Sequence, residues 1–402
     1  MRLRNRVLAG GGWVALIAAL AGCGATTATT TTITGTTLTI YASVPQNGPE
    51  SSEGHDVLAA EQLALQQAGG KVGAYKIDLV PLNDATSAGW SPKLIAANAR
   101  AVIQQANAVA YIGEIDPNAS AQSIPITNAD DLLQVSPYDT AIGLTLATRA
   151  VPNSPDVYYE ALSSNGRTFG RVVPNDTYQA KAQLQVMQSL GVKKLFIVED
   201  GEPYGDAIAL AVQQYAHAYG ITAGVPARTG AGLAQSGDDA LFYGGVANPN
   251  AVALFDGAAA ANPKLKLFGP GGVYTSSFTS QLSPAAQNAT YLSEPGLTAA
   301  ELPPAGKQFI TAFKTAYGHV PWTQAIFGYA AMQTVLRALT QAGAKLNVRQ
   351  ADINSFLGAK NISSALGTFS IDKHGDTSLA PYIFSRVKGG KLVAYKGLIV
   401  KP

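Results

Sequence analysis

The sequence predicts an α/β protein with two doubly wound parallel-sheet lobes. Short apolar runs typical of strands alternate along the chain with segments of helical periodicity, a pattern that favours parallel sheets covered by helices. The chain has 402 residues, more than one hydrophobic core usually serves, so two domains are expected. An irregular, Pro-containing stretch at residues 150–174 separates two runs of alternating elements, and we place the division between the lobes there.

The N-terminus has the pattern of a secretory signal peptide of 22 residues. Arg2, Arg4 and Arg6 precede an apolar run at residues 7–21, which is shorter than the ~20 residues that a spanning helix needs. Cys23 is similar in its position to the acylated cysteine of a bacterial lipobox. That resemblance implies removal of the signal peptide and diacylation of Cys23. The alternative is an unmodified cysteine after an ordinary signal peptide.

Residues 23–37 are expected to form a Thr-rich tether. After Cys23 this segment consists almost entirely of small residues and threonine, without the periodic apolar face that a packed element needs.

The composition gives no sign of a nucleic-acid partner. The chain has 28 Lys and Arg against 26 Asp and Glu, so loss of three N-terminal arginines would change the formal net charge from +2 to −1. A nearly neutral chain lacks the basic surface that attracts nucleic acid or an anionic membrane.

Residue types and spacing point away from metal, cofactor and catalytic sites. No Gly-x-Ser-x-Gly elbow, phosphate-binding loop or dinucleotide fingerprint is found. The four histidines are scattered, without a carboxylate or thiolate at ligand spacing: His55, His217, His319 and His374. We therefore expect no metal, no cofactor and no enzymatic activity.

The first half of the chain begins with an expected strand at residues 38–43, followed by a loop rich in Gly and Pro. Apolar residues at helical spacing predict a helix at residues 57–68. Ser91 and Pro92 form a good helix start, with Ser as the cap and Pro at the first helical position. The other strands expected in this half are residues 75–82, 109–112 and 133–136.

The second half repeats this alternation. Strands are expected at residues 195–198, 252–255 and 265–268, and helices at 206–219 and 323–341. The last stretch, residues 368–400, contains two glycine turns and is typical of antiparallel strands.

Six short segments follow one another in a characteristic order. They are residues 47–54, 135–137, 171–179, 198–205, 268–272 and 366–376. In these segments, and from about residue 38 to the C-terminus, the chain resembles the type I periplasmic binding proteins of the branched-chain amino acid (Leu/Ile/Val) receptor family, which serve ABC transporters.

The resemblance implies two Rossmann-like lobes joined by a hinge of three chain crossings, with a ligand cleft between them. It places the crossings near residues 169–171, near 293–297 and near Ala365. Lobe I would then comprise residues 38–170 and 297–365, and lobe II residues 171–296 and 366–402. Independently, open α/β sheets bind ligands at the carboxyl ends of their strands.

The resemblance also places two ligand-binding loops in the first lobe. In amino acid receptors of this family, these loops bind the ligand carboxylate through hydroxyls and backbone N–H groups. The corresponding residues here are Asn118, Ser120, Tyr138, Asp139 and Thr140. Asn118 or Ser120 could also cap the helix expected to begin near Ser120, whose N-terminus would favour an anion.

One position departs from the family pattern. Receptors for α-amino acids commonly carry an acid in a Gly-Pro-Glu-Gly motif, which pairs with the ligand ammonium, and here that position is Gly271. An ammonium buried without a partner is strongly unfavourable, so specificity for branched-chain amino acids is in question. Asp256, at the end of the strand expected at residues 252–255, could replace the missing acid or could be a turn residue.

Three tyrosines lie in loops that this fold turns toward the cleft: Tyr178, Tyr204 and Tyr274. A tyrosine offers an apolar face and one polar tip, so each could contact ligand or could pack its own loop. Glu50, in the first loop, could reach the cleft or remain a solvated carboxylate.

The expected function is that of a monomeric, lipid-anchored solute-binding protein on the extracytoplasmic face of the membrane. It would capture a small polar organic ligand, such as an amino acid, by lobe closure and deliver it to an ABC permease. The alternative is a sensory module that signals to a partner without transport, since both functions use the same clamp.

Overall fold

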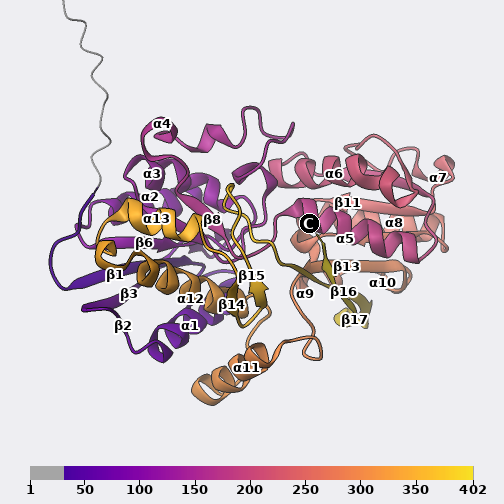
Figure 1. Ribbon diagram of the computed structural model, residues 1–402. Coiled ribbons are helices and arrows are strands. Elements are labelled where there is room, and N and C mark those ends of the chain that lie inside the picture. The colour runs from indigo at the N-terminus through magenta and orange to yellow at the C-terminus, as the bar shows by residue number, and fades with distance from the viewer. Residues whose placement is uncertain (1–30, 402) are drawn as a thin grey trace, which may run out of the picture.

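The computed structural model describes residues 31–401, which form two lobes lying side by side (Figure 1). Each lobe has a central sheet, helices packed against it and its own hydrophobic core. The prediction of two α/β lobes is confirmed. The expected signal peptide and Cys23 lie outside the described residues. Within residues 31–401 no helix combines the length and the apolar composition that a membrane span requires.

Lobe I is built on a six-stranded sheet. In spatial order its strands are β2 (Lys71–Val72), β3 (Tyr75–Asn83), β1 (Thr37–Val44), β6 (Ala108–Ile112), β7 (Leu133–Ser136) and β8 (Phe169–Arg171). Neighbouring strands are parallel except β2, which is antiparallel to β3. Every residue of β6 and β7 is buried, because helices cover both faces of a parallel sheet.

The helices of lobe I come from two parts of the chain. They are α1 (Ser51–Gln67), α2 (Pro92–Ile103), α3 (Ile124–Ala129), α4 (Leu162–Asn165), α11 (Pro304–Tyr317), α12 (Ala325–Ala342) and α13 (Arg349–Leu357). Helix α1 packs along α12, and α2 packs along α3. Two hairpins complete the lobe, β4 (Ala85–Thr86) with β5 (Gly89–Trp90), and β14 (Ile362–Ser364) with β15 (Gly367–Phe369).

Lobe II has a seven-stranded sheet. In spatial order its strands are β10 (Thr222–Ala223), β9 (Lys194–Glu199), β11 (Ala240–Gly244), β12 (Lys266–Gly269), β13 (Thr290–Pro295), β16 (Ala380–Lys388) and β17 (Lys391–Val400). The first five are parallel, whereas β16 and β17 run antiparallel, which confirms the expected antiparallel tail. The helices are α5 (Asp176–Ser189), α6 (Pro203–Ala216), α7 (Leu233–Ser236), α8 (Pro249–Ala261), α9 (Ser276–Thr279) and α10 (Pro284–Ala289).

Short 3-10 turns occur in both lobes. They are Ala119–Gln122, Ile142–Leu144, Asp156–Tyr158, His217–Tyr219, Gly271–Val273 and Gly343–Lys345.

The chain passes between the lobes three times. It leaves lobe I after β8 and enters α5, and it returns from β13 to α11. These two crossings lie near residues 169–171 and 293–297.

The third crossing comes later in the chain than the expected position near Ala365. Leu366, Phe369 and Ile371 are buried in the core of lobe I, because the hairpin β14–β15 turns its apolar side chains toward that core. Ala380 is the first residue of this segment in the core of lobe II. The segment after Ile371 therefore forms the crossing, and the expected lobe boundary needs this correction.

The tether expected at residues 23–37 needs a correction at its C-terminal end. Ile33 is buried in the core of lobe I, and Thr32 forms an antiparallel bridge with Val348. The Ile33 N–H donates to the Asn347 carbonyl over 2.7 Å. Residues 31–33 are therefore held against lobe I by the buried Ile33 side chain together with backbone hydrogen bonds.

The strand expected at residues 252–255 is wrong, because these residues lie in helix α8. Asn248 caps this helix by accepting a hydrogen bond from the Ala251 N–H, and Pro249 occupies its first turn. The alanine run that follows also favours a helix. The strand of this region is β11, immediately before the cap.

Candidate ligand site between the lobes

The carboxyl ends of the parallel strands in the two lobes meet. Tyr138, in the loop after β7, donates from its hydroxyl to the carbonyl of Pro295, the last residue of β13, over 2.8 Å. In lobe I the strand order reverses at β1, which lies between β3 and β6. In lobe II it reverses at β9, between β10 and β11. Open α/β sheets bind ligands at such reversal points, so the candidate site lies here.

Asp139 ties the two expected binding loops of lobe I together. Its carboxylate accepts hydrogen bonds from the backbone N–H groups of Asn118 and Ser120, each over 2.8 Å, and from that of Ala141 over 3.1 Å. These are the N–H groups that the family resemblance would assign to a ligand carboxylate. The Ser120 hydroxyl in turn accepts from the Glu114 N–H over 3.1 Å. The loops are brought together as expected, but an internal carboxylate already occupies their donors.

Thr140 lies at the first chain crossing. Its Oγ1 donates to Oδ2 of Asp176 over 2.9 Å, and the Asp176 N–H donates to the Thr140 carbonyl over 2.9 Å. Both residues are almost fully buried. Burial raises the pKa of Asp176 to about 8, although the Thr140 hydrogen bond opposes that rise. The hydroxyl expected to hold ligand therefore also secures the start of α5.

Tyr138 contacts Glu294, which the sequence analysis does not single out. The Tyr138 hydroxyl lies 3.3 Å from Oε2 of Glu294, and its ring packs edge-on against Phe327 at a centroid distance of 5.1 Å. Gln324 donates to the same carboxylate over 3.5 Å. Glu294 is buried, and this burial raises its pKa to about 8. The signal in the sequence is an acid immediately before Pro295, within the segment 293–297 expected to cross between the lobes.

The three tyrosines of lobe II have different environments. Tyr274 shares a hydrogen bond of 2.6 Å with Ser385. Burial raises the pKa of Tyr274, and the charge of Glu294 adds a smaller effect in the same direction. Tyr204 is buried and its hydroxyl accepts from the Gly272 N–H over 3.1 Å. Tyr178 is partly buried and packs on the lobe II core. Of the three tyrosines, Tyr274 is the one whose pKa is affected by the charge of Glu294 at the interlobe site.

Asp256 is not brought together with the other candidates. It lies within α8, and its Oδ1 accepts a hydrogen bond from the Ser283 N–H over 2.8 Å, just before α10 begins. Because residues 252–255 are helical, the strand-end position that suggested Asp256 as an ammonium partner does not exist.

Five carboxylates lie at or just after the carboxyl ends of strands on the edges where the two lobes meet, and we call them the interlobe acid cluster. They are Glu50 and Glu53 at the start of α1, Asp84, Asp116 and Glu294. Asp84 and Asp116 follow the carboxyl ends of β3 and β6, and burial raises the pKa of both. For Asp116, the charges of Asp84 and Glu50 add to that effect. The charge of Glu53 likewise contributes to the raised pKa of Glu294, which connects the lobe I acids to lobe II.

Gly48 places the Glu50 loop beside Asp84. Its φ of +80° is in the left-handed region, and a Cβ there would lie 2.4 Å from the Thr86 carbonyl. Only glycine allows the loop after β1 to approach the hairpin β4–β5 so closely. The hairpin begins directly after Asp84.

A family model described as periplasmic binding protein matches residues 37–391 of this chain. The chain is a periplasmic binding protein. Among its relatives is the Leu/Ile/Val-binding protein of Escherichia coli K12, which is 25% identical over 347 residues, covering 82% of this chain and 85% of the relative. The protein of the same name from Citrobacter freundii is 26% identical over the same shares of both chains.

Solved structures agree with this fold. A leucine-binding protein from Thermotoga maritima superposes with a TM-score of 0.72 and 20% identity, over 91% of this chain and 99% of that one. A solute-binding protein of an ABC transporter from R. palustris, in complex with benzoate, gives a TM-score of 0.67 and 18% identity, over 91% and 97%.

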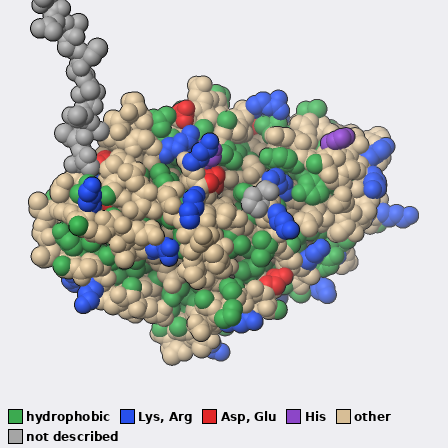
Figure 2. Space-filling model, viewed as in Figure 1, with side chains coloured by type: hydrophobic (Ala, Val, Ile, Leu, Met, Phe, Trp, Pro, Cys, Tyr) green, Lys and Arg blue, Asp and Glu red, His purple; other side chains and the backbone are tan. Residues whose placement is uncertain are grey.

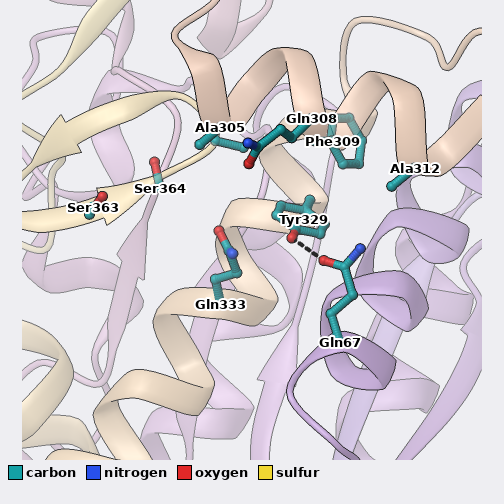
Figure 3. Close-up of a pocket in the computed structure, with 10 residues that line it drawn as sticks. Gln67, Ala305, Gln308, Phe309, Ala312, Tyr329, Gln333, Ser363 and Ser364 are labelled. Atoms are coloured by element: carbon teal, nitrogen blue, oxygen red, sulfur yellow. Dashed lines mark hydrogen bonds between the residues drawn. The ribbon is translucent and has the colours of Figure 1, made fainter.

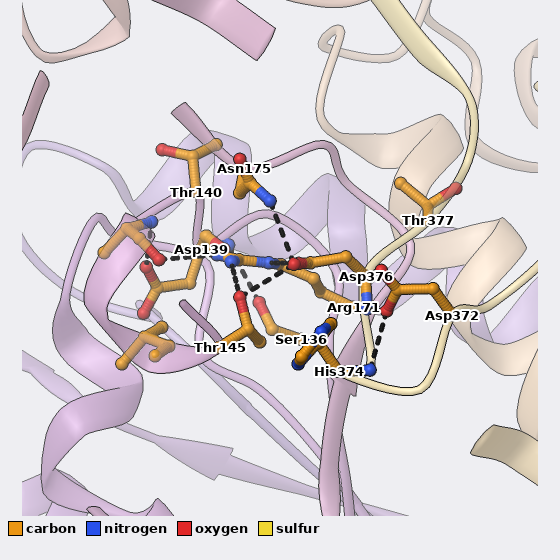
Figure 4. Close-up of polar contacts among 12 residues, drawn as sticks. Ser136, Asp139, Thr140, Thr145, Arg171, Asn175, Asp372, His374, Asp376 and Thr377 are labelled. Carbon is orange, nitrogen blue, oxygen red and sulfur yellow. Dashed lines mark hydrogen bonds and ion pairs between the residues drawn. The ribbon is translucent and has the colours of Figure 1, made fainter. Parts of the chain in front are cut away.

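The hinge of this binding protein contains a buried ion pair (Figure 4). Arg171, at the end of β8, donates from Nε to Oδ1 of Asp376, in the third crossing, over 2.6 Å. Its other nitrogens donate to the carbonyls of Asp139 and Ala141 and to the Thr145 hydroxyl. One guanidinium therefore connects the loop after β7 with two of the three chain crossings.

A separate pocket of about 340 Å³ lies on lobe I among α1, α11 and α12 (Figure 3). Tyr329 donates to Gln67 across it over 2.5 Å, and Ser363 and Ser364 of β14 form one wall. None of the expected site residues lines this pocket. Within residues 31–401, no three His, Cys, Asp or Glu side chains converge in a way that could hold a metal ion.

Proposed function

We propose that this periplasmic binding protein is a lipid-anchored solute receptor that captures a small polar organic ligand between its lobes and presents it to an ABC permease. The observation that carries this proposal is the meeting of the two carboxyl edges, where Tyr138 of lobe I reaches Glu294 and Pro295 at the end of β13. A ligand bound there contacts both lobes and stabilises their closed arrangement.

The relatives support a small organic solute as the ligand. The Escherichia coli relative is named for Leu, Ile and Val, and one solved neighbour contains benzoate. An amino acid or a related compound is therefore the ligand class we propose.

The residues proposed to contact or to shape the ligand site come from both lobes. Tyr138, Tyr274 and Glu294 offer polar tips at the interlobe surface, whereas Asn118, Ser120, Asp139 and Thr140 fix the loops around it. Tyr178, whose ring packs on the lobe II core, is proposed to stabilise the start of α5.

Lobe closure is tested by small-angle X-ray scattering of the soluble protein with and without a saturating solute. The solute is chosen from a thermal-shift screen of amino acids, amides, short acids, amines and sugars, because a ligand that binds only the native state raises the melting temperature. We expect a smaller radius of gyration with the solute. An unchanged radius with every stabilising solute would contradict a clamp.

The proposed anchor is tested by Cys23→Ser in the full chain. Two acyl chains give stable membrane attachment, at ~0.8 kcal/mol for each buried CH₂. The variant should therefore move from the membrane fraction to the soluble extracytoplasmic fraction. A variant that stays in the membrane, uncleaved, would indicate a retained signal anchor instead.

A further inference from the structure

The interlobe acid cluster contains buried oxygens that have no hydrogen-bond partner among the described residues. They are Oε2 of Glu50, Oε2 of Glu53, Oδ1 of Asp84 and Oδ2 of Asp116. Asp84 is fully buried, and the Ser43 hydroxyl donates only to its other oxygen, over 3.3 Å. Buried polar atoms in native proteins are nearly always paired with protein, water or ligand, so these oxygens require a donor from outside the chain, as do those of Glu61 and Asp352 elsewhere in the fold.

The cluster has no cationic partner in the part of the chain that the structure describes. The six ion pairs between residues 31 and 401 involve other carboxylates, at Asp56, Asp78, Asp130, Asp156, Glu199 and Asp376. Hydroxyls and an amide are the groups that contact the cluster, with Ser43 donating to Asp84 and with Tyr138 and Gln324 at Glu294, and the charges that act on Asp84 and Asp116 are those of further carboxylates. Figure 2 shows lysine and arginine scattered over the visible face rather than gathered in a patch.

The excess of acceptors extends into the neighbouring amides. Oε1 of Gln179, of Gln183 and of Gln324 is also buried without a partner, while the amide nitrogens of these residues donate to Ser293, Gly269 and Glu294. Meanwhile, Asp139 occupies the backbone N–H groups that could hold an anion. The site therefore offers many acceptors and few free donors, which suits a ligand rich in N–H donors.

Two tyrosines add a surface for an organic cation. The Tyr138 hydroxyl, which donates to the Pro295 carbonyl, lies 3.3 Å from Oε2 of Glu294. Burial raises the pKa of Tyr274, and the charge of Glu294 adds to that effect. Tyrosine rings attract ammonium and guanidinium groups through their π faces, and they also cover the alkyl part of such a ligand.

We propose that the ligand of this site is an organic cation, a compound with an ammonium or guanidinium group that the interlobe acid cluster binds. This inference rests on the function proposed above and narrows its ligand class. A cation between the lobe I acids and Glu294 is attracted to both lobes, so its charge would favour closure. The cluster would ionise on binding, since burial holds the pKa of Asp84 at about 7 and that of Glu294 at about 8.

The test uses four defined probes with the soluble receptor at pH 8. Agmatine and spermidine are organic cations without a carboxylate, leucine is a zwitterion and benzoate is an anion. Thermal shift and isothermal titration are measured for each probe, and scattering is recorded with each probe that binds. We expect agmatine or spermidine to bind and to compact the protein. We expect leucine and benzoate to bind with at least tenfold lower affinity.

Two variants locate the binding site. Glu294→Gln and Asp116→Asn keep the side-chain size but remove one charge each. Each variant should lower the affinity for the cation at least tenfold, because hydrogen bonds to charged groups contribute ~1.5–3 kcal/mol. The matched control is Glu61→Gln, which replaces another fully buried carboxyl group of α1, outside the cluster, and should leave affinity unchanged.

The outcomes separate the two proposals. Binding of leucine or benzoate with compaction, and no binding of either cation, would overturn the cationic ligand and leave the solute receptor standing. Cation binding that Glu61→Gln weakens as much as Glu294→Gln would also overturn it. If neither the four probes nor any hit of the wider solute screen compacts the protein, both the proposed receptor function and the proposed cationic ligand are contradicted.

Discussion

Thr140 donates a hydrogen bond to a carboxyl group that has few other partners. The second oxygen of that group, Oδ1 of Asp176, is buried without a partner among the described residues. Thr140→Val keeps the shape of the side chain but leaves Asp176 without this donor. We expect the free energy of unfolding, measured by urea denaturation at pH 7, to fall by ~1–3 kcal/mol.

Thr315 provides a matched control. Its hydroxyl is exposed on α11 and donates to the Thr311 carbonyl within the same helix. Thr315→Val removes a hydroxyl from an exposed helical site and should change the free energy of unfolding by no more than about 0.5 kcal/mol. Equal losses in the two variants would show that the Thr140 hydrogen bond has no special importance.

The sequence predicts the site only in part at this scale. The resemblance identified the loops that contain Asn118 and Thr140, and the structure brings them to one sheet edge. Occupation of their N–H groups by Asp139 depends on the relative position of two loops far apart in sequence, which no local pattern specifies. Glu294 could have been predicted as a site residue, because it is an acid within the segment 293–297 that was expected to cross between the lobes beside the cleft.

At the scale of elements, α8 shows where a short apolar run misleads. Residues 252–255 are apolar and four residues long, a length at which strand and helix cannot be distinguished by periodicity alone. The informative residues stood just before the run, where Asn248 and Pro249 form a helix start. In contrast, the C-terminal strands β16 and β17 were predictable because the Gly389–Gly390 turn fixes their pairing.

The crossing segments depend on one buried ion pair. Arg171→Met would leave Asp376 buried without its cationic partner, and removal of one member of a buried pair typically costs ~3–5 kcal/mol. We expect a loss of this size in the free energy of unfolding, measured by urea denaturation.

Two further variants check this explanation. Lys76→Met breaks the exposed pair with Asp78 and should cost no more than about 1 kcal/mol. The double variant Arg171→Met/Asp376→Leu removes both buried charges and should recover part of the loss. A double variant less stable than Arg171→Met alone would show that the hydrogen bonds Asp376 accepts from Asn175 and Thr145 stabilise the fold more than its unpaired charge destabilises it.

At the scale of the whole molecule, acids dominate the buried charges. Among residues 31–401, the buried side chains include eleven Asp or Glu and two Arg. Burial raises the pKa of Asp84 to about 7 and those of Glu114, Asp176 and Glu294 to about 8. Between their unfolded pKa values, near 4, and these folded values, the native state binds more protons than the unfolded state. Stability is therefore greatest at low pH within this window and falls as pH rises.

The melting temperature of the ligand-free protein should accordingly decrease between about pH 5 and pH 8.5. Glu294→Gln removes one titrating group and should make this decrease smaller, whereas Asp78→Asn, at an exposed position, should leave it unchanged. A melting temperature that rises over this range would contradict the raised pKa values.

The docking of residues 31–33 against Asn347, Val348 and Arg349 would determine which lobe stays fixed if the chain is anchored at its N-terminus as proposed. All of these contacts belong to lobe I, so anything attached upstream of residue 31 pulls on that lobe alone. For a receptor held at its N-terminus, lobe I then stays in place and lobe II moves relative to it when the lobes close. A transporter that distinguishes the loaded from the empty receptor would have to sense the position of lobe II, whose edge strands are β10 and β17.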